Sequence, residues 1–396
     1  MKHPILLLAT LLTTVSAFAG PAAPAPTGKA VIDPVKASDP CDEMWAWTTL
    51  YKNDSNPFLQ EFAFTGRYHG QYAIVESDRR DADGWDNRRF RLGFRAKVWQ
   101  DFEVKTEMYS DLNNDDFYSG LTDAHIAWKP SDAFNLTVGK QKPKFSLDWT
   151  TSSREIVTIE RNILLNNLGI DYETGVSVSG KQGNWSYFTG VFNNDTGDLG
   201  DERELGDLDG GWSWIASLAY DLKAQTGLDK AVLRADYLHS EHDVQDDHLT
   251  RFDDAVAVSF NAKKGKLGVI TEVLWAEGEH ASNRRTDGDM WGFYIMPTWD
   301  FSKKLQLVGR FTHAESDDHT LRAQGRYERG SEIGGISIPG SGYGDSYNAF
   351  YLGLNYYLCG HKLKFMSGLE YAELGGLTAG GDHETLTWVN GLRLYW

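Results

Sequence analysis

The last twelve residues, Thr385–Trp396 (TLTWVNGLRLYW), alternate between apolar and polar side chains. Every second position is apolar apart from Asn390, and the apolar series is Leu386, Trp388, Leu392, Leu394 and Trp396. A period of two is typical of a β-strand with one apolar face. A chain that ends on an aromatic residue within such a strand favours a barrel closed by its last strand, as in bacterial outer-membrane proteins.

Runs of the same kind follow one another from Leu59 to the end of the chain, and we count sixteen. The predicted strands are Leu59–Glu76, Asn87–Trp99, Phe102–Ser110, Leu121–Lys129, Phe134–Lys140, Tyr172–Gly180, Asn184–Asn193, Trp212–Leu222, Lys230–Ser240, Phe252–Lys263, Lys266–Gly278, Met290–Trp299, Lys304–Glu315, Tyr347–Leu358, His361–Ala372 and Thr385–Trp396. Short turns alternate with long connections, which are Ser77–Asp86, Asp111–Gly120, Gln141–Asp171, Asn194–Gly211, Glu241–Arg251, Glu279–Asp289, Ser316–Ser346 and Glu373–Glu384. This alternation predicts an all-β fold, a transmembrane antiparallel β-barrel of about 16 strands. The alternative is a soluble all-β domain, in which short and long connections are not required to alternate.

The first residues have the features of a secretory signal peptide. Lys2 supplies a positive charge, Ile5–Leu12 is apolar, and Ala17-Phe18-Ala19 is a small-x-small cleavage motif. We therefore predict a signal peptide over residues 1–19, a periplasmic lead-in over 20–57 and the barrel over 58–396. Within the lead-in, the stretch rich in Ala and Pro is expected to be flexible, and Cys41–Asn53 is either a short helix or a plug-like segment.

Composition agrees with a barrel in the outer membrane. The chain has 14 Trp, 18 Tyr, 19 Phe and 40 Gly, which barrels use for aromatic girdles and tight turns. Its mean hydropathy of −0.45 is ordinary for a protein in which half of each strand faces water. A net charge of −17 argues against a nucleic-acid partner, but it does not fix the sign of charge inside a pore.

The two cysteines, Cys41 and Cys359, are expected on the periplasmic side of the barrel. A disulfide is permitted in that oxidising compartment, so the two form a candidate pair; the alternative is two unrelated thiols. The acidic segments Asp195–Asp209 and Asp81–Asp86 have carboxylates that Ca²⁺ prefers, but neither matches a full calcium-loop spacing. We expect solvated surface loops there and no metal site.

The third long connection, Gln141–Asp171, differs from the other loops because it contains an apolar pattern. Ile156, Ile159, Ile163 and Leu164 are spaced like one face of a helix within Ser152–Asn167. Ser152 or Ser153 is a candidate N-cap, and Glu155 falls in the first turn. We predict an amphipathic segment that folds into the lumen, places its apolar face on the wall and narrows the pore. The alternative is a loop that packs on top of the barrel.

The second predicted strand has a basic face. Its lipid-facing set is Phe90, Leu92, Phe94, Ala96 and Val98, so its inward set is Arg89, Arg91, Gly93, Arg95 and Lys97. Neighbours on one face lie about 6.6 Å apart, which predicts a basic stripe along the pore. Arg67 on the first strand is expected to face the same water, and the third loop adds Lys140, Lys142, Lys144, Arg154 and Arg161. These ten residues are the candidate pore-lining and anion-binding groups.

The alternative interpretation of the stripe is one half of a field of mixed charge. Glu103, Glu107 and Asp123 alternate inward on the next strands, and either Glu103 or Lys105 is expected opposite Lys97. No motif for catalysis is present: the chain has no GxSxG, HExxH or phosphate loop, and no nucleophile can be assigned to the strand histidines. We therefore expect neither an enzyme nor a cofactor.

Several pieces of the chain resemble the phosphate-selective porin O and P family. They are Asn56-Pro57-Phe58, Gly66–Tyr72, the arginine-rich second strand, Asp123-Ala124, Val138–Pro143, and Ser152–Glu155 leading to Glu160-Arg161. The resemblance runs from about Trp45 to Trp396. It implies a sixteen-stranded barrel, a homotrimer and passive uptake through a constriction lined by basic side chains. It carries over Lys140, Lys142, Lys144, Arg154 and Arg161 as third-loop candidates.

These observations predict an outer-membrane porin for small hydrophilic solutes, with a bias toward phosphate or other anions. Its expected partners are those solutes, outer-membrane lipid and further copies of the same chain, and not nucleic acid. The rival prediction is a non-conducting barrel that serves as an adhesin or envelope anchor through its acidic loops.

Overall fold

The structure, a computed structural model, describes residues 40–194, 211–241, 250–278 and 288–396. The chain divides into two compact units, residues 1–44 and 45–396. The described part of the first unit belongs to the short helix α1 (Pro40–Trp45). The predicted signal peptide and the Ala- and Pro-rich stretch lie outside the described residues, so the predicted domain boundaries stay predictions.

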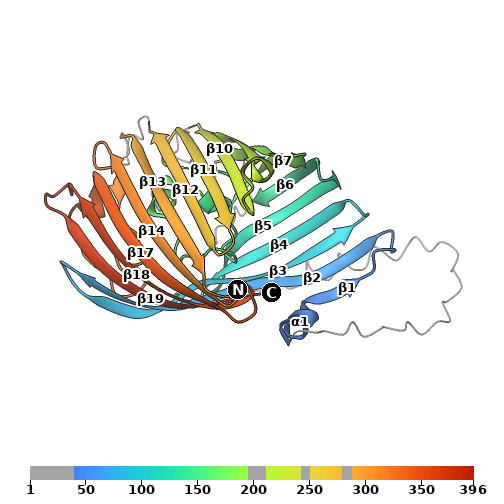
Figure 1. The fold of residues 1–396 in the computed structure, drawn as a ribbon, viewed down its shortest axis with the longest axis horizontal. Coiled ribbons are helices and arrows are strands. Elements are labelled where there is room, and N and C mark those ends of the chain that lie inside the picture. Colours follow the sequence, from blue (N-terminus) through green and yellow to red (C-terminus); the bar gives the residue numbers. More distant parts are fainter. Residues whose placement is uncertain (1–39, 195–210, 242–249, 279–287) are drawn as a thin grey trace, which may run out of the picture. The chain divides into compact units, whose positions relative to one another are not determined.

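The second unit is a closed antiparallel barrel of sixteen strands, which confirms the predicted fold (Figure 1). The barrel strands are β2 (Leu59–Ser77), β3 (Ala82–Val98), β4 (Phe102–Asp111), β5 (Asp116–Ser131), β6 (Phe134–Gln141), β7 (Glu173–Gln182), β8 (Trp185–Asn193), β9 (Trp212–Asp221), β10 (Lys230–Ser240), β11 (Asp254–Lys264), β12 (Leu267–Glu277), β13 (Met290–Asp300), β14 (Leu305–Ser316), β17 (Ser346–Tyr357), β18 (Leu363–Gly375) and β19 (His383–Tyr395). Each pairs with the next in sequence. A short additional strand, β1 (Thr49–Lys52), pairs with the first residues of β2.

The last strand closes the barrel, as its alternation predicts. β19 pairs with β2 from Thr385↔Ser77 to Tyr395↔Arg67. Beyond it, Trp396 and Gly66 exchange two backbone hydrogen bonds of 3.0 and 3.1 Å. A Cβ atom on Gly66 would lie 2.4 Å from the Trp396 ring, so only glycine leaves room for the closing tryptophan at this point.

The strands present an apolar face to the outside. On β17 the outward residues Phe350, Leu352 and Leu354 are 59, 58 and 42% exposed, and buried residues alternate with them. Exposed tryptophans mark the barrel end that carries the short turns: Trp99, Trp128, Trp185 and Trp299. This is the aromatic girdle of a membrane barrel. Among the described residues, none of the helices has the length and apolarity needed to cross a membrane.

The first two long connections are shorter than predicted. β2 continues to Ser77 and β3 begins at Ala82, where the sequence predicts a loop over Ser77–Asp86. β5 likewise begins at Asp116, within the predicted loop Asp111–Gly120. These strand ends are rich in polar residues, so they show no apolar face that a search for alternation can detect, yet their backbones still pair.

The seventh long connection, residues 317–345, is folded and contributes to the core. It contains β15 (Leu321–Arg322), η2 (Pro339–Gly342) and β16 (Tyr343–Gly344). Its buried apolar side chains belong to one cluster with the third loop and the inner wall: Leu321, Ala323, Tyr327, Ile333, Ile336 and Ile338. The sequence predicts only a long connection here, because these apolar residues follow no regular period and only the fold brings them together.

Among the described residues, neither Cys41 nor Cys359 is a free thiol. The pairing of Cys41 with Cys359 stays a prediction. Peptide mapping of the non-reduced protein would test it, since two separate, alkylatable thiols would contradict the pair.

Candidate functional site

The third loop is mostly irregular, and the predicted helix over Ser152–Asn167 is wrong except for its last residues. Helix is found only in α2 (Leu147–Thr150) and α3 (Ile163–Leu168). The side chain of Asn162 caps α3 by accepting from the Leu164 N–H. Neither Ser152 nor Ser153 caps a helix, because four β-branched residues, Ile156–Ile159, follow them and disfavour helix.

The third loop nevertheless folds into the lumen, as predicted. Ile156 and Ile159 are 3 and 2% exposed. The loop carbonyls accept hydrogen bonds from side chains of the wall in the pairs Ile156–Lys364 (2.5 Å), Val157–Asn355 (2.8 Å), Ile159–Arg393 (3.2 Å) and Glu160–Arg310 (3.1 Å). Donors on the wall thus take the place of the intrahelical hydrogen bonds that the apolar spacing suggests.

The tip of the third loop is fastened to the opposite wall by Glu272 on β12. Its carboxyl group, almost fully buried, accepts from Ser146 Oγ at 2.5 Å and from the Leu147 N–H at 2.7 Å. Ser146 has φ of 61°, a left-handed conformation that is unusual for a residue other than glycine. Two wall contacts therefore hold a strained turn at the start of α2.

The register of β2, β3 and β4 places the basic stripe inside the barrel. Arg67 pairs with Arg91, and Lys97 pairs with Glu103, which resolves the two options for the residue opposite Lys97 in favour of the acid. Arg67 and Arg89 are 5 and 7% exposed. These arginines are far more buried than side chains of an open, water-filled bore.

Acids neutralise much of the stripe. The Glu107 carboxylate, 0% exposed, contacts Arg67 at 2.6 Å, Arg154 at 3.3 Å and Arg91 at 3.5 Å. Arg95 pairs with Glu61 at 2.5 Å. The mixed-charge interpretation therefore describes most of the stripe.

A β-bulge in β3 turns a further arginine, Arg88, toward the third loop, which the alternation along the strand does not predict. The pairing steps from His69↔Arg89 to Gln71↔Asp86, so β3 has one extra residue at this point. Arg88 thereby reaches Glu160 of the third loop at 2.7 Å, although its neighbour Arg89 also faces inward. Burial raises the pKa of Glu160, but the Arg88 and Arg89 guanidiniums outweigh it and hold that pKa below its usual value.

The far side of β2 carries further wall cations that the sequence analysis missed. Lys364 pairs with Arg393, Arg393 with His69, and His69 with Arg89, which forms one basic row across four neighbouring strands. The signal is present in the last strand, because Arg393 lies between the outward Leu392 and Leu394. Both Lys364 and Arg393 donate to the third loop, so they hold the loop and do not line open water.

The third-loop cations lie over aromatic rings. Lys142 Nζ is 4.3 Å from the Trp149 ring centroid, Arg161 is 5.4 Å from the same ring, and Arg154 is 5.2 Å from that of Tyr395. Arg161 also pairs with Asp148 at 3.4 Å. Burial and then nearby guanidiniums, that of Arg161 first, hold the pKa of Lys142 well below its usual range.

The interior contains two cavities on the β3–β9 side. The first, which we call the arginine chamber, has a volume of about 260 Å³ and is lined by Arg88, Arg89, Arg91, Tyr109, Leu121, Thr122, Lys140, Trp149, Ile170, Asp171, Tyr172 and Glu173. The second, the turn-side cavity, has about 800 Å³ and reaches the short turns at Gln100, Asp132 and Lys181. Trp149 lines the chamber and the adjacent Thr150 lines the turn-side cavity, so α2 separates the two.

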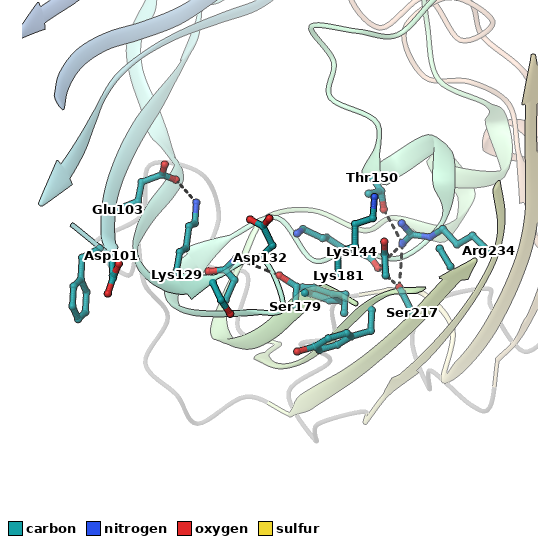
Figure 2. Close-up of a pocket in the computed structure, with 18 of the residues that line it drawn as sticks. Asp101, Glu103, Lys129, Asp132, Lys144, Thr150, Ser179, Lys181, Ser217 and Arg234 are labelled. Atoms are coloured by element: carbon teal, nitrogen blue, oxygen red, sulfur yellow. Dashed lines mark hydrogen bonds and ion pairs between the residues drawn. The ribbon is translucent and has the colours of Figure 1, made fainter. Parts of the chain in front are cut away.

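Charged side chains of both signs line the turn-side cavity, and they form two groups on opposite sides of it (Figure 2). Glu103 and Lys129 pair at 2.8 Å on one side. On the other side Arg234 donates to Thr150 Oγ1 and Ser217 Oγ at 3.1 Å each, beside Lys144. Lys97 also lines this cavity. Such a mixture attracts neither anions nor cations strongly.

Within the described residues, no group of three His, Cys, Asp or Glu side chains is arranged to hold a metal ion, and this includes the acidic segment Asp81–Asp86. The second acidic segment, Asp195–Asp209, lies outside the described residues.

Known proteins of similar sequence and fold are porins. The family model described as phosphate-selective porin O and P matches residues 62–373. A comparison with curated proteins found no match. Among solved structures, the fold is similar to the outer membrane channel DcaP of Acinetobacter baumannii (14% identity, 87% of this chain and 99% of that chain, TM-score 0.58). It is also similar to OprB of Pseudomonas putida (14% identity, 85% and 94%, TM-score 0.57) and to OmpF of Salmonella typhi (11% identity, 88% and 100%, TM-score 0.56).

At these identities the likeness to solved structures concerns the fold, and the assignment to a family rests on the family model. That model covers most of the barrel, including the arginine-rich β3 and the third loop that lies against it. The chain belongs to the phosphate-selective porin O and P family and is a channel of the bacterial outer membrane.

Proposed function

We propose that this channel conducts small hydrophilic solutes by passive diffusion and prefers anions, phosphate among them. The observation that carries the proposal is the state of Arg89. Its side chain is 7% exposed and lines the arginine chamber, and among the described residues no hydrogen-bond acceptor is found for its Nη1 atom. A buried guanidinium nitrogen without an acceptor favours an anion that supplies one.

The surroundings of Arg89 strengthen this preference. Arg88, Arg91 and Lys140 line the same chamber, against the acids Asp171 and Glu173. Cations therefore outnumber acids in the lining. The walls exclude much of the water that screens charge in solution, so the field of the excess cations acts strongly on an ion that enters. Family and barrel are both typical of non-enzymatic channels, and we assign the protein no covalent chemistry.

The test is the reversal potential of the purified protein in a planar bilayer under a KCl gradient. We expect a potential of the sign that chloride permeation gives. Replacing Arg89 by Gln should reduce the anion-to-cation permeability ratio at least about fivefold, because one unit charge about 4 Å from an ion contributes about 1 kcal/mol even in bulk water, and more where water is excluded.

The matched control is Lys223→Gln, which removes an exposed charge from α4 (Lys223–Thr226) at a short turn. This variant should keep the wild-type ratio. A cation-selective wild-type channel, or equal ratios for Arg89→Gln and wild type, would contradict the proposed anion preference.

A non-conducting barrel is the second candidate, and one observation favours it. Side chains of the third and the seventh loop join one buried apolar cluster with the inner wall, so part of the bore is filled. Planar-bilayer recording separates the candidates, because a silent barrel would support a role as adhesin or envelope anchor.

We also propose a homotrimer embedded in outer-membrane lipid. The apolar outward face supports the lipid contact, and the family resemblance supports the trimer. Native mass spectrometry from detergent would test the assembly, and a monomer mass under mild conditions would contradict it.

A further inference from the structure

Part of the lining of the arginine chamber is apolar or aromatic, and a preference for anions does not explain this part. Besides its charged side chains, it is lined by the apolar or aromatic residues Tyr109, Leu121, Trp149, Ile170 and Tyr172. An inorganic phosphate gains nothing from such a wall and loses hydration against it. A solute that carries both a carboxylate and a flat ring can use the cations and the rings together.

We propose that the arginine chamber is a selective site for aromatic monocarboxylates, in which the carboxylate binds Arg89 and the ring packs among the aromatic side chains. This inference rests on the proposed anion-conducting function and names the solute class that the chamber favours over inorganic phosphate and over aliphatic acids of equal charge.

The rings of the chamber are held in place before any solute arrives. The Tyr172 hydroxyl oxygen accepts a hydrogen bond of 2.8 Å from Arg91 Nη1, and the Tyr172 ring lies 4.9 Å from the Arg91 guanidinium carbon. Trp149 meets the Tyr172 ring edge-on, with centroids 6.0 Å apart. Tyr109 lies on the other flank of Arg91, at 6.0 Å. Rings fixed in this way lose little freedom when a solute packs on them, which favours binding.

Among the described residues, three donor atoms in the lining of the chamber lack an acceptor: Arg89 Nη1, Arg91 Nε and Trp149 Nε1. The charge of Arg91 is already balanced by Glu107, and its Nη1 atom donates to Tyr172. The carboxylate of a solute therefore belongs at Arg89, and Trp149 offers a ring together with an indole N–H beside it.

The volume limits the size of the solute. The chamber, with about 260 Å³, lies just below the roughly 300–1,000 Å³ of sites for drug-sized ligands. A one-ring acid such as benzoate is of suitable size. A disaccharide or a two-ring acid would have to displace α2, which separates the chamber from the turn-side cavity.

The experiment measures block of the chloride current of the purified channel by added benzoate, cyclohexanecarboxylate or phosphate at constant ionic strength. Benzoate and cyclohexanecarboxylate have the same charge and similar size, and only benzoate has an aromatic ring. We expect half-block by benzoate at a concentration about two- to tenfold lower than by cyclohexanecarboxylate, the range that specific aromatic pairing gives beyond simple burial. Phosphate should be the weakest blocker.

Trp149→Leu should reduce the benzoate preference toward one, whereas the matched variant Trp299→Leu, on the exposed girdle outside the bore, should keep it. Heat-dependent gel mobility checks that each variant is folded. Equal half-block by the two acids in the wild-type channel would overturn the inference even if no variant folds. Reversal potentials from the same bilayers separate the two possible failures. A cation-selective current would contradict the proposed anion preference, whereas an anion-selective current with equal half-block by the two acids would contradict only the preference for aromatic acids.

Discussion

Replacing Glu107 by Gln should lower the free energy of unfolding by about 3–5 kcal/mol, the usual cost of removing one partner from a buried ion pair. Glu107 is fully buried and is the acid shared by Arg67, Arg91 and Arg154. The glutamine keeps the size of the side chain but leaves these guanidiniums without their negative charge. Equilibrium unfolding in urea, with refolding into lipid, measures the loss.

The same variant should increase the anion preference of the channel, because the wall gains net positive charge beside the chamber. Its matched control is Glu103→Gln on the same strand. Glu103 pairs with Lys129, whose side chain is 40% exposed, and such a pair contributes at most about 1 kcal/mol. Equal losses of stability in the two variants would show that Glu107 has no special part in holding the arginines.

Replacing Glu272 by Ala should release the tip of the third loop and raise the single-channel conductance, with more current noise. The variant removes the acceptor for Ser146 Oγ and for the Leu147 N–H. At about 1 kcal/mol each, the loss of both hydrogen bonds favours a displaced loop by about 2 kcal/mol, or about thirtyfold. Ser146 also loses what holds it in its strained conformation.

Glu272→Gln is the control for this variant, because the amide keeps one acceptor and the size of the side chain. Its conductance should stay between those of wild type and Glu272→Ala. If both variants conduct like the wild type, Glu272 does not position the loop and other contacts suffice. Those other contacts are known, since the wall residues Lys364, Arg393 and Arg310 hold the later part of the loop by its carbonyls.

The seventh loop adds a second structure inside the mouth of the barrel. Arg326 pairs with Asp86 of β3 at 2.6 Å, and Tyr327 hydrogen-bonds Gln71 of β2. Tyr327 shares a small cavity of about 30 Å³ with Glu160 of the third loop. The third and the seventh loop therefore both fill part of the bore.

The alternation of apolar and polar residues is sufficient to predict the barrel. Sixteen strands, the closure by the last strand and the inward direction of Arg89, Arg91 and Lys97 follow from alternation, because a strand sends successive side chains to opposite faces whatever its neighbours are. The inward fold of the third loop was also predictable, since four apolar side chains in a loop are stabilised when they are buried against another surface of the protein. Their helical spacing was misleading, because donors on a distant wall compete for the same carbonyls.

Which cations are neutralised depends on contacts between segments that lie far apart in the sequence. Arg88 faces Glu160 because of a bulge, which depends on pairing between two strands and leaves no mark in the spacing of one. Glu107 contacts three arginines from two strands and a loop, whereas in the described part of the chain Arg89 Nη1 has no acceptor. Alternation fixes the face on which a residue lies, whereas the partner that it meets across the bore depends on register and on how the loops fold inward.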